Sequence, residues 1–286
     1  MLKKIQRKVA QLAMLPAELR YQWQLIRHAP QLPTLAESDQ SIVETLKKEG
    51  VCVTSLEKLG LASTDNLLQV AKQYLEQMQH IIPKQSLKDV DRSQVTQSLH
   101  PQIFTVTDLP KFANFGEESR LLHIIENYIG LPIAFQGIHL RRDFANPSPI
   151  TTELWHQDLE DRRILKVIVY LSDVLGEEDG PFEYIPKSTV SPLRSLLIHR
   201  RIAKAHALGI DDTVMQQFVP QTQWKKCFGP VGTVVLMDPK NIFHHGKSRL
   251  NERAALFYVY TSANPLRPEH CKQYRDKTFA RPEFIA

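Results

Sequence analysis

The sequence has few of the features that define several large protein classes. Only three of its 286 residues are cysteines, Cys52, Cys227 and Cys271, and they lie far apart. This spacing gives neither a disulfide framework nor a CxxC zinc pattern, so we expect free thiols in a reducing compartment. No apolar run approaches the ~18 residues that a membrane-spanning helix needs. Glycine, at 11 residues, is too scarce for a collagen-like or glycine-rich disordered chain.

Charge of one sign is concentrated in one segment. The formal net charge is +5. Residues 1–34 hold six basic residues and one acidic residue (6 − 1 = +5), so the rest of the chain is neutral in sum. The positive charge therefore gives no argument for a nucleic-acid partner. The basic start of the chain lacks a long apolar core and a small-residue cleavage site, so we expect no secretory signal and a cytoplasmic protein.

The first residues form a basic amphipathic segment over 1–29. Pro30 and Pro33 separate this segment from the rest of the chain, so we divide the protein into a helical arm, 1–40, and a single domain, 41–286. In one interpretation the arm packs on the body, and in the other it lies on an anionic membrane surface as a peripheral contact. The apolar residues at helical spacing are Leu2, Ile5, Val9, Leu12 and Leu15.

Residues 41–132 carry mainly helical patterns. Apolar residues in the longer stretches recur on one helical face, which is typical of helices that pack on a core. The predicted elements are a helix that a Ser41–Glu44 capping box opens and Gly50 closes, a strand over 51–56, and helices over 64–81 and 117–129.

From residue 133 the pattern changes to short apolar runs between turn signals. Helices followed by strands predict an α+β protein. We expect a double-stranded β-helix (a cupin-like jelly roll) over 133–265, N-terminal helices packed on one side, and a C-terminal tail over 266–286. The predicted strands are 133–142, 153–158, 164–171, 181–186, 232–238 and 255–261, with a helical interruption near 192–218.

The run WHQD contains the first candidate ligands of a metal ion. In a strand, alternate residues share a face, so His156 and Asp158 would point the same way. An imidazole nitrogen and a carboxylate oxygen suit Fe(II) or Mn(II), and zinc as an alternative. The later run FHHG offers His244 or His245 as a third ligand. Two histidines and one carboxylate form the facial triad of non-haem Fe(II) oxygenases.

Arg253 comes after the FHHG run, at the start of a predicted strand. A dicarboxylate cosubstrate that chelates iron through one end needs a cation for its other end, and a guanidinium binds a carboxylate through two parallel hydrogen bonds. A surface arginine is the alternative. Asp143, next to Arg141 and Arg142, is expected to form structural salt bridges rather than to bind substrate. His139 is expected to be a packing or surface residue.

Two runs together resemble the phytanoyl-CoA dioxygenase family of Fe(II)/2-oxoglutarate oxygenases. These runs are WHQDLEDRRILKVIVYLSDVLGEEDGPFEYIPKS and GTVVLMDPKNIFHHGKSRLNERAALFY. The resemblance covers residues 133–262 and extends to the N-terminal third only in general layout. It implies Fe(II) as cofactor, 2-oxoglutarate and O2 as cosubstrates, and ascorbate as a stimulating reductant.

The resemblance also implies roles for individual residues. His156 and Asp158 match the first two iron ligands of the family. His244 matches the distal histidine, because it stands two residues before Gly246 in an H-x-G pattern, and His245 is the alternative. Arg253 matches the arginine that binds the distal carboxylate of 2-oxoglutarate.

Two residues of the strand after WHQD are further candidates for cosubstrate binding. Tyr170 matches an aromatic position of the family that lines the cosubstrate pocket. Lys166 shares strand parity with Tyr170, and either faces the pocket to meet an anionic group or lies at the solvent rim. The sequence departs from the family at Gly246, where a hydroxyl residue is usual, and this departure weakens one expected cosubstrate contact.

The predicted function is therefore oxidation, by hydroxylation or desaturation, of a small-molecule or lipid-like substrate with release of succinate and CO2. Family members that halogenate lack the carboxylate at the position of Asp158, so its presence disfavours halogenation. The alternatives are a non-catalytic metal-binding jelly-roll protein, with membrane association through residues 1–29, and a zinc or manganese hydrolase with the same ligands. The sequence indicates neither the substrate nor the oligomeric state.

Overall fold

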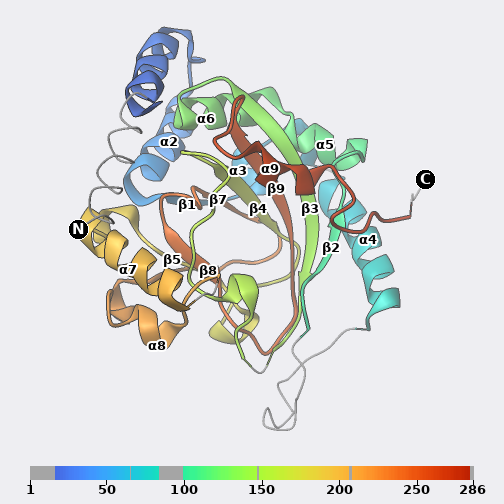
Figure 1. Cartoon of the computed structure of the whole chain (residues 1–286). Coiled ribbons are helices and arrows are strands. Elements are labelled where there is room, and N and C mark those ends of the chain that lie inside the picture. Colours follow the sequence, from blue (N-terminus) through green and yellow to red (C-terminus); the bar gives the residue numbers. More distant parts are fainter. Residues whose placement is uncertain (1–16, 65, 84–98, 147, 206–207, 284–286) are drawn as a thin grey trace.

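The computed structural model describes residues 17–64, 66–83, 99–146, 148–205 and 208–283. Two antiparallel sheets face each other, and helices cover their outer faces (Figure 1). The strands are β1 Val51–Ser55, β2 Gln102–Thr105, β3 Ile133–Asp143, β4 Leu165–Tyr170, β5 Phe182–Ile185, β6 Lys225–Cys227, β7 Thr233–Met237, β8 Phe243–Gly246 and β9 Arg253–Ser262. The helices are α2 Glu37–Glu49, α3 Leu56–Leu59, α4 Leu67–Ile81, α5 Pro110–Gly116, α6 Ser119–Ile129, α7 Pro192–Ala205, α8 Asp212–Met215 and α9 Pro268–Cys271.

The larger sheet has the strand order β1-β7-β4-β9-β3-β2, and the smaller sheet has the order β6-β5-β8. All of these neighbours pair antiparallel. From β4 onward the chain passes repeatedly from one sheet to the other, because β4, β7 and β9 belong to the larger sheet and β5, β6 and β8 to the smaller one. This alternation brings the ends of strands that are distant in the sequence together at one end of the space between the two sheets.

Helices α2 to α6 pack on the outer face of the larger sheet. In α4 the buried residues recur at helical spacing, as the sequence pattern predicts. The prediction of N-terminal helices on one side of the strands is confirmed. The predicted start of the first of these helices is wrong, because α2 begins at Glu37 and Ser41 lies inside it. Its predicted end is confirmed, since Gly50 takes the left-handed conformation, with φ 84°, that glycine favours.

The outer face of the smaller sheet is covered by α7 and α8, which fall in the predicted helical interruption. Ile198 of α7 and Met215 of α8 are fully buried there against Trp155 and Phe243. Each sheet therefore has a covered outer face. The space between the two inner faces is filled at one end by side chains, among them Val235 and Tyr184.

The predicted strand over 153–158 is wrong. Residues 151–153 form a turn of 3-10 helix, in which Thr151 has a positive φ of 41°. Beyond it the chain makes only isolated bridges, from Trp155 to Ile210 and from His156 to His244. The alternating pattern therefore produced an extended segment at the edge of the smaller sheet, which pairs there through single bridges rather than a ladder.

Residues 17–28 of the predicted arm are helical, and residues 1–16 lie outside the described part of the chain. The helix contacts the body through Leu25, which packs on the core, and through His28, whose Nε2 is 2.9 Å from Glu126 Oε1. Leu19, Trp23 and Ile26 are exposed on it. Within the ranges given above, no helix is both long enough and apolar enough to cross a bilayer.

Candidate active site

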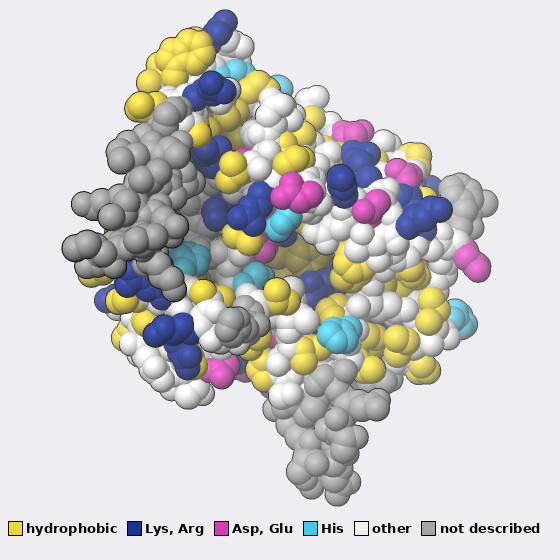
Figure 2. Space-filling view, in the orientation of Figure 1, with side chains coloured by type: hydrophobic (Ala, Val, Ile, Leu, Met, Phe, Trp, Pro, Cys, Tyr) yellow, Lys and Arg dark blue, Asp and Glu magenta, His cyan; other side chains and the backbone are white. Residues whose placement is uncertain are grey.

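A cavity of about 420 Å³ opens between the two sheets. Its walls are the inner faces of β3, β4 and β9, the segment that carries His156 and Asp158, and the C-terminal segment around Tyr274 and Phe279. Figure 2 shows a hollow near the middle of the face in view, with hydrophobic side chains inside it. Its volume lies in the range of ~300–1,000 Å³ that is usual for small-molecule sites.

The structure brings His156, Asp158 and His244 together in this cavity. One ligand atom from each lies within 4.8 Å of those of the other two. The backbones of His156 and His244 exchange two hydrogen bonds, of 3.0 and 3.1 Å, and the two ring centroids are 4.4 Å apart. The amide of Asp158 donates to the carbonyl of Pro239 at 3.0 Å. These backbone contacts fix the three side chains although 88 positions separate the two histidines (244 − 156).

The two imidazoles of this group are oriented for metal binding. His156 Nδ1 donates to the carbonyl of Leu154 at 2.7 Å, which leaves Nε2 toward the carboxylate of Asp158, 3.6 Å from its Oδ1. A histidine that donates one ring N–H to a carbonyl is a neutral ligand through the other nitrogen. Burial lowers the pKa of His156, and burial together with the nearby His156 lowers the pKa of His244 to about 3.

The carboxylate of Asp158 is held in its ionised form. Burial raises its pKa most strongly, but the Lys166 ammonium, together with His244 and His156, keeps the pKa well below its usual range. Lys166 Nζ lies 2.5 Å from Asp158 Oδ2 and 3.4 Å from Glu160 Oε1. The sequence left open whether Lys166 faces the pocket, and the structure places it in the cavity wall.

The donor set fits a divalent iron ion. Two neutral imidazoles and one ionised carboxylate on one side of a cavity are the ligand chemistry of the facial triad. The Lys166 ammonium donates a hydrogen bond to Oδ2 of Asp158. The other carboxylate oxygen, Oδ1, faces the imidazole of His156. The protonation states required for metal binding are therefore those that the protein environment imposes.

His245 points to the opposite face of β8 and does not join this group. Its Nδ1 is 2.8 Å from the carbonyl of Glu153, and its Nε2 is 2.9 Å from Glu183 Oε2. Its ring stacks on Trp155 with centroids 4.1 Å apart. Of the two histidines that the sequence left open, His244 is therefore the one that lies with His156.

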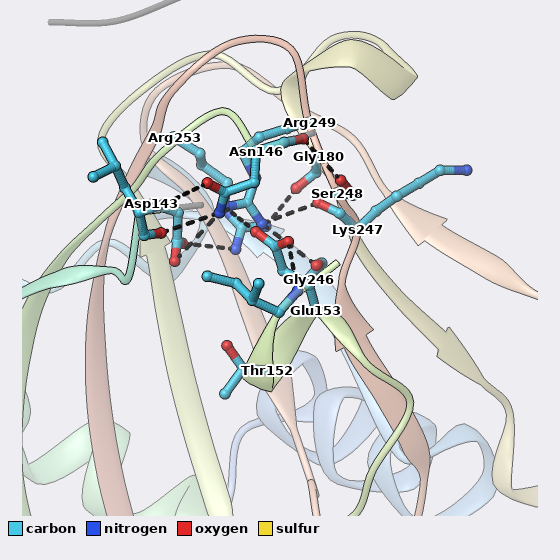
Figure 3. Close-up of polar contacts among 12 residues, drawn as sticks. Asp143, Asn146, Thr152, Glu153, Gly180, Gly246, Lys247, Ser248, Arg249 and Arg253 are labelled. Atoms are coloured by element: carbon cyan, nitrogen blue, oxygen red, sulfur yellow. Dashed lines mark hydrogen bonds and ion pairs between the residues drawn. The ribbon is translucent and has the colours of Figure 1, made fainter. Parts of the chain in front are cut away.

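Arg253 lies in the cavity wall at the start of β9. Its Nη1 donates to the carbonyl of Gly180 at 2.5 Å, and its Nη2 lies 3.0 Å from Asp143 Oδ2. Its Nε is buried without a hydrogen-bond partner among the described residues. In Figure 3 the side chains of Arg253 and Arg249 converge on Asp143, and Arg249 also reaches Glu153 at 3.2 Å. A buried guanidinium with an unused donor beside the cavity fits a carboxylate ligand.

Asp143 is the common partner of this arginine cluster. Burial would raise its pKa, but Arg141, Arg249 and Arg253 hold the pKa far below its usual range. The prediction that Asp143 forms structural salt bridges is confirmed by its contacts with Arg141 at 2.6 Å and with Arg253 at 3.0 Å.

Tyr170 lines the cavity from β4, and its hydroxyl donates to the carbonyl of Cys227 at 2.8 Å.

Gly246, where the family usually has a hydroxyl residue, has a steric reason to be glycine in this fold. A Cβ atom at this position would lie 2.9 Å from Arg253 Nη2 and 3.3 Å from Arg249 Nη2. The absent side chain therefore makes room for the two guanidinium groups.

Sequence reasoning missed two other parts of the wall. His139, expected as a packing or surface residue, lines the cavity, with Tyr274 and Phe279 against its ring at centroid distances of 4.6 and 4.9 Å. Arg141 lines the cavity as well. Strand parity was an available signal, because residues 139 and 141 alternate on one strand and share a face. The contribution of the C-terminal segment had no sequence signal.

No protein-family model matches the chain, and no curated protein matches its sequence. Solved structures do match its fold. The structure of HygX from Streptomyces hygroscopicus with nickel and 2-oxoglutarate bound has a TM-score of 0.54 at 18% identity, over 81% of this chain and 88% of HygX. EctD from S. alaskensis with 2-oxoglutarate and 5-hydroxyectoine has a TM-score of 0.50 at 16% identity, over 85% of this chain and 84% of EctD.

A third match is SnoN, the non-haem α-ketoglutarate-dependent epimerase from nogalamycin biosynthesis. Its TM-score is 0.51 at 14% identity, over 87% of this chain and 91% of SnoN. These matches span most of each chain. The chain shares the fold of HygX, EctD and SnoN.

Proposed function

We propose that the protein is an Fe(II)- and 2-oxoglutarate-dependent oxygenase. One observation carries the proposal: two neutral imidazoles and an ionised carboxylate converge in a cavity whose wall also holds the buried guanidinium of Arg253. A metal-binding protein without this chemistry has no need of a second, cationic subsite beside the ion. The shared fold supports the same conclusion, because HygX and EctD have been solved with 2-oxoglutarate bound.

In this proposal His156, Asp158 and His244 hold the iron, and Arg253 binds the distal carboxylate of 2-oxoglutarate. Bound iron and 2-oxoglutarate supply the oxidising chemistry, in which O2 and 2-oxoglutarate give succinate, CO2 and one oxygen atom for the substrate. The remaining roles belong to the protein. Lys166 holds the carboxylate of Asp158 in place, Tyr170 closes the deep wall, and apolar side chains limit the access of water.

The finer assignments belong to the same proposal. The two facing sheets are those of a jelly roll, residues 41–286 form one oxygenase domain, and the chain is similar to the phytanoyl-CoA dioxygenase family within the wider group of oxygenases. The cavity volume of about 420 Å³ suits a small molecule that is bound together with 2-oxoglutarate. HygX has been solved with hygromycin B and EctD with 5-hydroxyectoine, which are small molecules. We also propose, as the alternative to such a small molecule, a lipid-like substrate, together with a peripheral membrane contact through residues 1–29.

Binding of 2-oxoglutarate to the metal-loaded protein tests the proposal directly. We expect Mn(II)-loaded wild-type protein to bind 2-oxoglutarate in anaerobic calorimetry, and protein without metal to bind it much more weakly. Arg253→Met should weaken binding of 2-oxoglutarate by about 10–100-fold, because a charged hydrogen-bonded pair contributes roughly 1.5–3 kcal/mol. Its affinity for Mn(II) should not change.

Succinate release from 2-oxoglutarate with Fe(II) and ascorbate provides the second measurement, with His156→Ala as the inactive control. If 2-oxoglutarate binds no better with metal than without it, the proposal is wrong, and the non-catalytic metal-binding protein takes its place. If the anaerobically purified protein contains zinc and hydrolyses esters, the hydrolase with the same ligands takes its place.

A further inference from the structure

The cavity contains a second guanidinium, that of Arg141, which the metal centre and Arg253 do not account for. Arg141 lies on β3, where its Cα partners are Ala255 of β9 on one side and Ile103 of β2 on the other. The next strand beyond β9 places Tyr170 opposite Ala255. Arg141 is therefore two strand spacings, about 10 Å, from the strand that carries Tyr170 and Lys166.

The guanidinium of Arg141 is fixed in position but is not fully used. Its Nε donates to Asp143 Oδ1 at 2.6 Å, and its Nη2 donates to Thr152 Oγ1 at 2.7 Å. The group lies 5.7 Å from the centroid of the Phe257 ring. Within the described part of the chain, Nη1 makes no hydrogen bond. Nη1 does not belong to the buried polar atoms that lack a partner, so this donor keeps access to the cavity that Arg141 lines.

The acidic groups around the cavity are already paired. Asp158 and Glu160, the two carboxylates of its wall, both contact the ammonium of Lys166. Behind the wall, Asp143 and Glu153 contact three guanidiniums, those of Arg141, Arg249 and Arg253, so in this cluster the guanidiniums outnumber the carboxylates by one (3 − 2), whereas at Lys166 the carboxylates outnumber the ammonium by one (2 − 1).

Apolar side chains of both strands next to β3 line the cavity beside Arg141. Ile103 lies on β2, Phe257 lies on β9 between Arg141 and the strand of Tyr170, and Phe279 belongs to the C-terminal segment. A ligand in this part of the cavity would lie between apolar walls with one charged donor at their border. Since Arg141 shares its charge with Asp143, a singly charged group matches it better than a dianion does.

We propose that Arg141 binds the carboxylate of the primary substrate, and that this substrate is a small organic acid with an apolar body. The assignment rests on the proposed oxygenase function, in which Arg253 holds the cosubstrate and the rest of the cavity receives the substrate. Arg141 then fixes the acid group at the β2 side and leaves the apolar body toward the metal centre.

The experiment compares acids with their uncharged amides on Mn(II)-loaded protein saturated with 2-oxoglutarate. The probes are 3-phenylpropanoate and octanoate against 3-phenylpropanamide and octanamide, with dissociation constants measured by calorimetry. We expect each acid to bind at least about tenfold more tightly than its amide, as for one charged hydrogen bond in a partly buried site. Arg141→Met should abolish this preference, whereas Arg141→Lys, which keeps the charge, should retain part of it.

Arg201→Met is the matched control, because Arg201 is an exposed residue of α7 on the other side of the smaller sheet. It should retain the full preference for acids. Arg141 and Arg253 share Asp143 as a partner and are therefore coupled, so Arg141→Met should lose some affinity for 2-oxoglutarate but clearly less than Arg253→Met does.

Three results would overturn the assignment while leaving the oxygenase proposal intact. These are the failure of both acids to bind, equal affinity for acids and amides, and a loss of 2-oxoglutarate affinity in Arg141→Met as large as in Arg253→Met. If wild-type protein with Mn(II) does not bind 2-oxoglutarate, the oxygenase proposal itself fails, and the assignment of Arg141 fails with it.

Discussion

Two groups of side chains on opposite faces of β8 both have the composition of a metal site. The inner group is His156, Asp158 and His244, and the outer group is Glu183, Asp212 and His245. In each group one ligand atom per residue lies within 4.8 Å of the others. Composition and proximity therefore do not distinguish them.

The two groups differ in whether their donor atoms are already used. In the outer group both ring nitrogens of His245 face acceptors, and Asp212 accepts a hydrogen bond from Trp155 Nε1 at 2.7 Å. In the inner group the Nε2 atom of His156 and Asp158 Oδ1 face each other at 3.6 Å without a hydrogen bond. A metal site requires uncommitted ligand atoms, so the inner group is the candidate centre and the outer group stabilises the fold.

The comparison predicts opposite results for alanine substitutions at the two adjacent histidines. His244→Ala should reduce the affinity for Mn(II) by more than about 100-fold, because changes to residues that only orient ligands already cost about 10–100-fold. His245→Ala should keep the affinity within about tenfold. Calorimetric titration with Mn(II) measures both variants, and a larger loss in His245→Ala would reverse the assignment of the two faces.

For the free energy of unfolding we expect the opposite order, with a larger loss in His245→Ala than in His244→Ala. Among the described residues, His245→Ala leaves the carboxylate of Glu183, which is 1% exposed, with Lys226 as its charged partner, at the longer distance of 3.7 Å. We expect the free energy of unfolding to fall by about 3 kcal/mol, because removing the nearer partner of a buried charge is strongly destabilising. Urea unfolding of the metal-free proteins measures this change, for which His244→Ala is the paired comparison. Equal stability of His245→Ala and wild type would show that the outer group contributes little to folding.

A third histidine, His139, which lines the cavity, predicts that the stability of the fold depends on pH. Burial lowers its pKa to about 4. Below its ordinary pKa of 6.5 the unfolded chain binds a proton on this imidazole, while the folded chain does not until about pH 4. This group therefore stabilises the fold fully above pH 6.5, and the stabilisation falls by about 2 kcal/mol between pH 7.5 and pH 5.

Replacement of His139 by glutamine, which does not titrate, isolates this contribution. The difference between wild type and His139→Gln in the pH dependence of urea unfolding should be about 2 kcal/mol over this interval. Parallel pH profiles of the two proteins would contradict a buried, neutral imidazole at this position.

The smallest expected effect concerns Trp155, which stacks on His245 in the outer group. Trp155→Phe removes the hydrogen bond from Nε1 to Asp212, whose side chain is 40% exposed. We expect a loss of about 1 kcal/mol in the free energy of unfolding and no change in the affinity for Mn(II). Thermal unfolding and the same Mn(II) titration test this prediction, and weaker metal binding would show that the two faces of β8 are coupled.

Local patterns in the sequence were enough to predict many of the helices and strands. The apolar stripe of α4, the end of α2 at Gly50, and strands β3, β4, β7 and β9 follow from helical or alternating periodicity, which is a property of neighbouring residues. The pairing of His156 with Asp158 was also local, since residues two apart in extended chain share a face. The strand predicted around them was wrong, because residues 151–153 form a turn of 3-10 helix and the segment after it makes isolated bridges instead of a ladder.

Contacts between distant residues were fixed only by the folded chain. Only the folded chain distinguishes His244 from His245 as a ligand, because the bridge between His156 and His244 fixes which face of β8 turns inward. Arg253 meets Asp143 across 110 positions, and Tyr274 reaches His139 across 135 (274 − 139). Such contacts depend on how strands pair, which a periodic pattern does not specify, because the same alternation is compatible with several pairings.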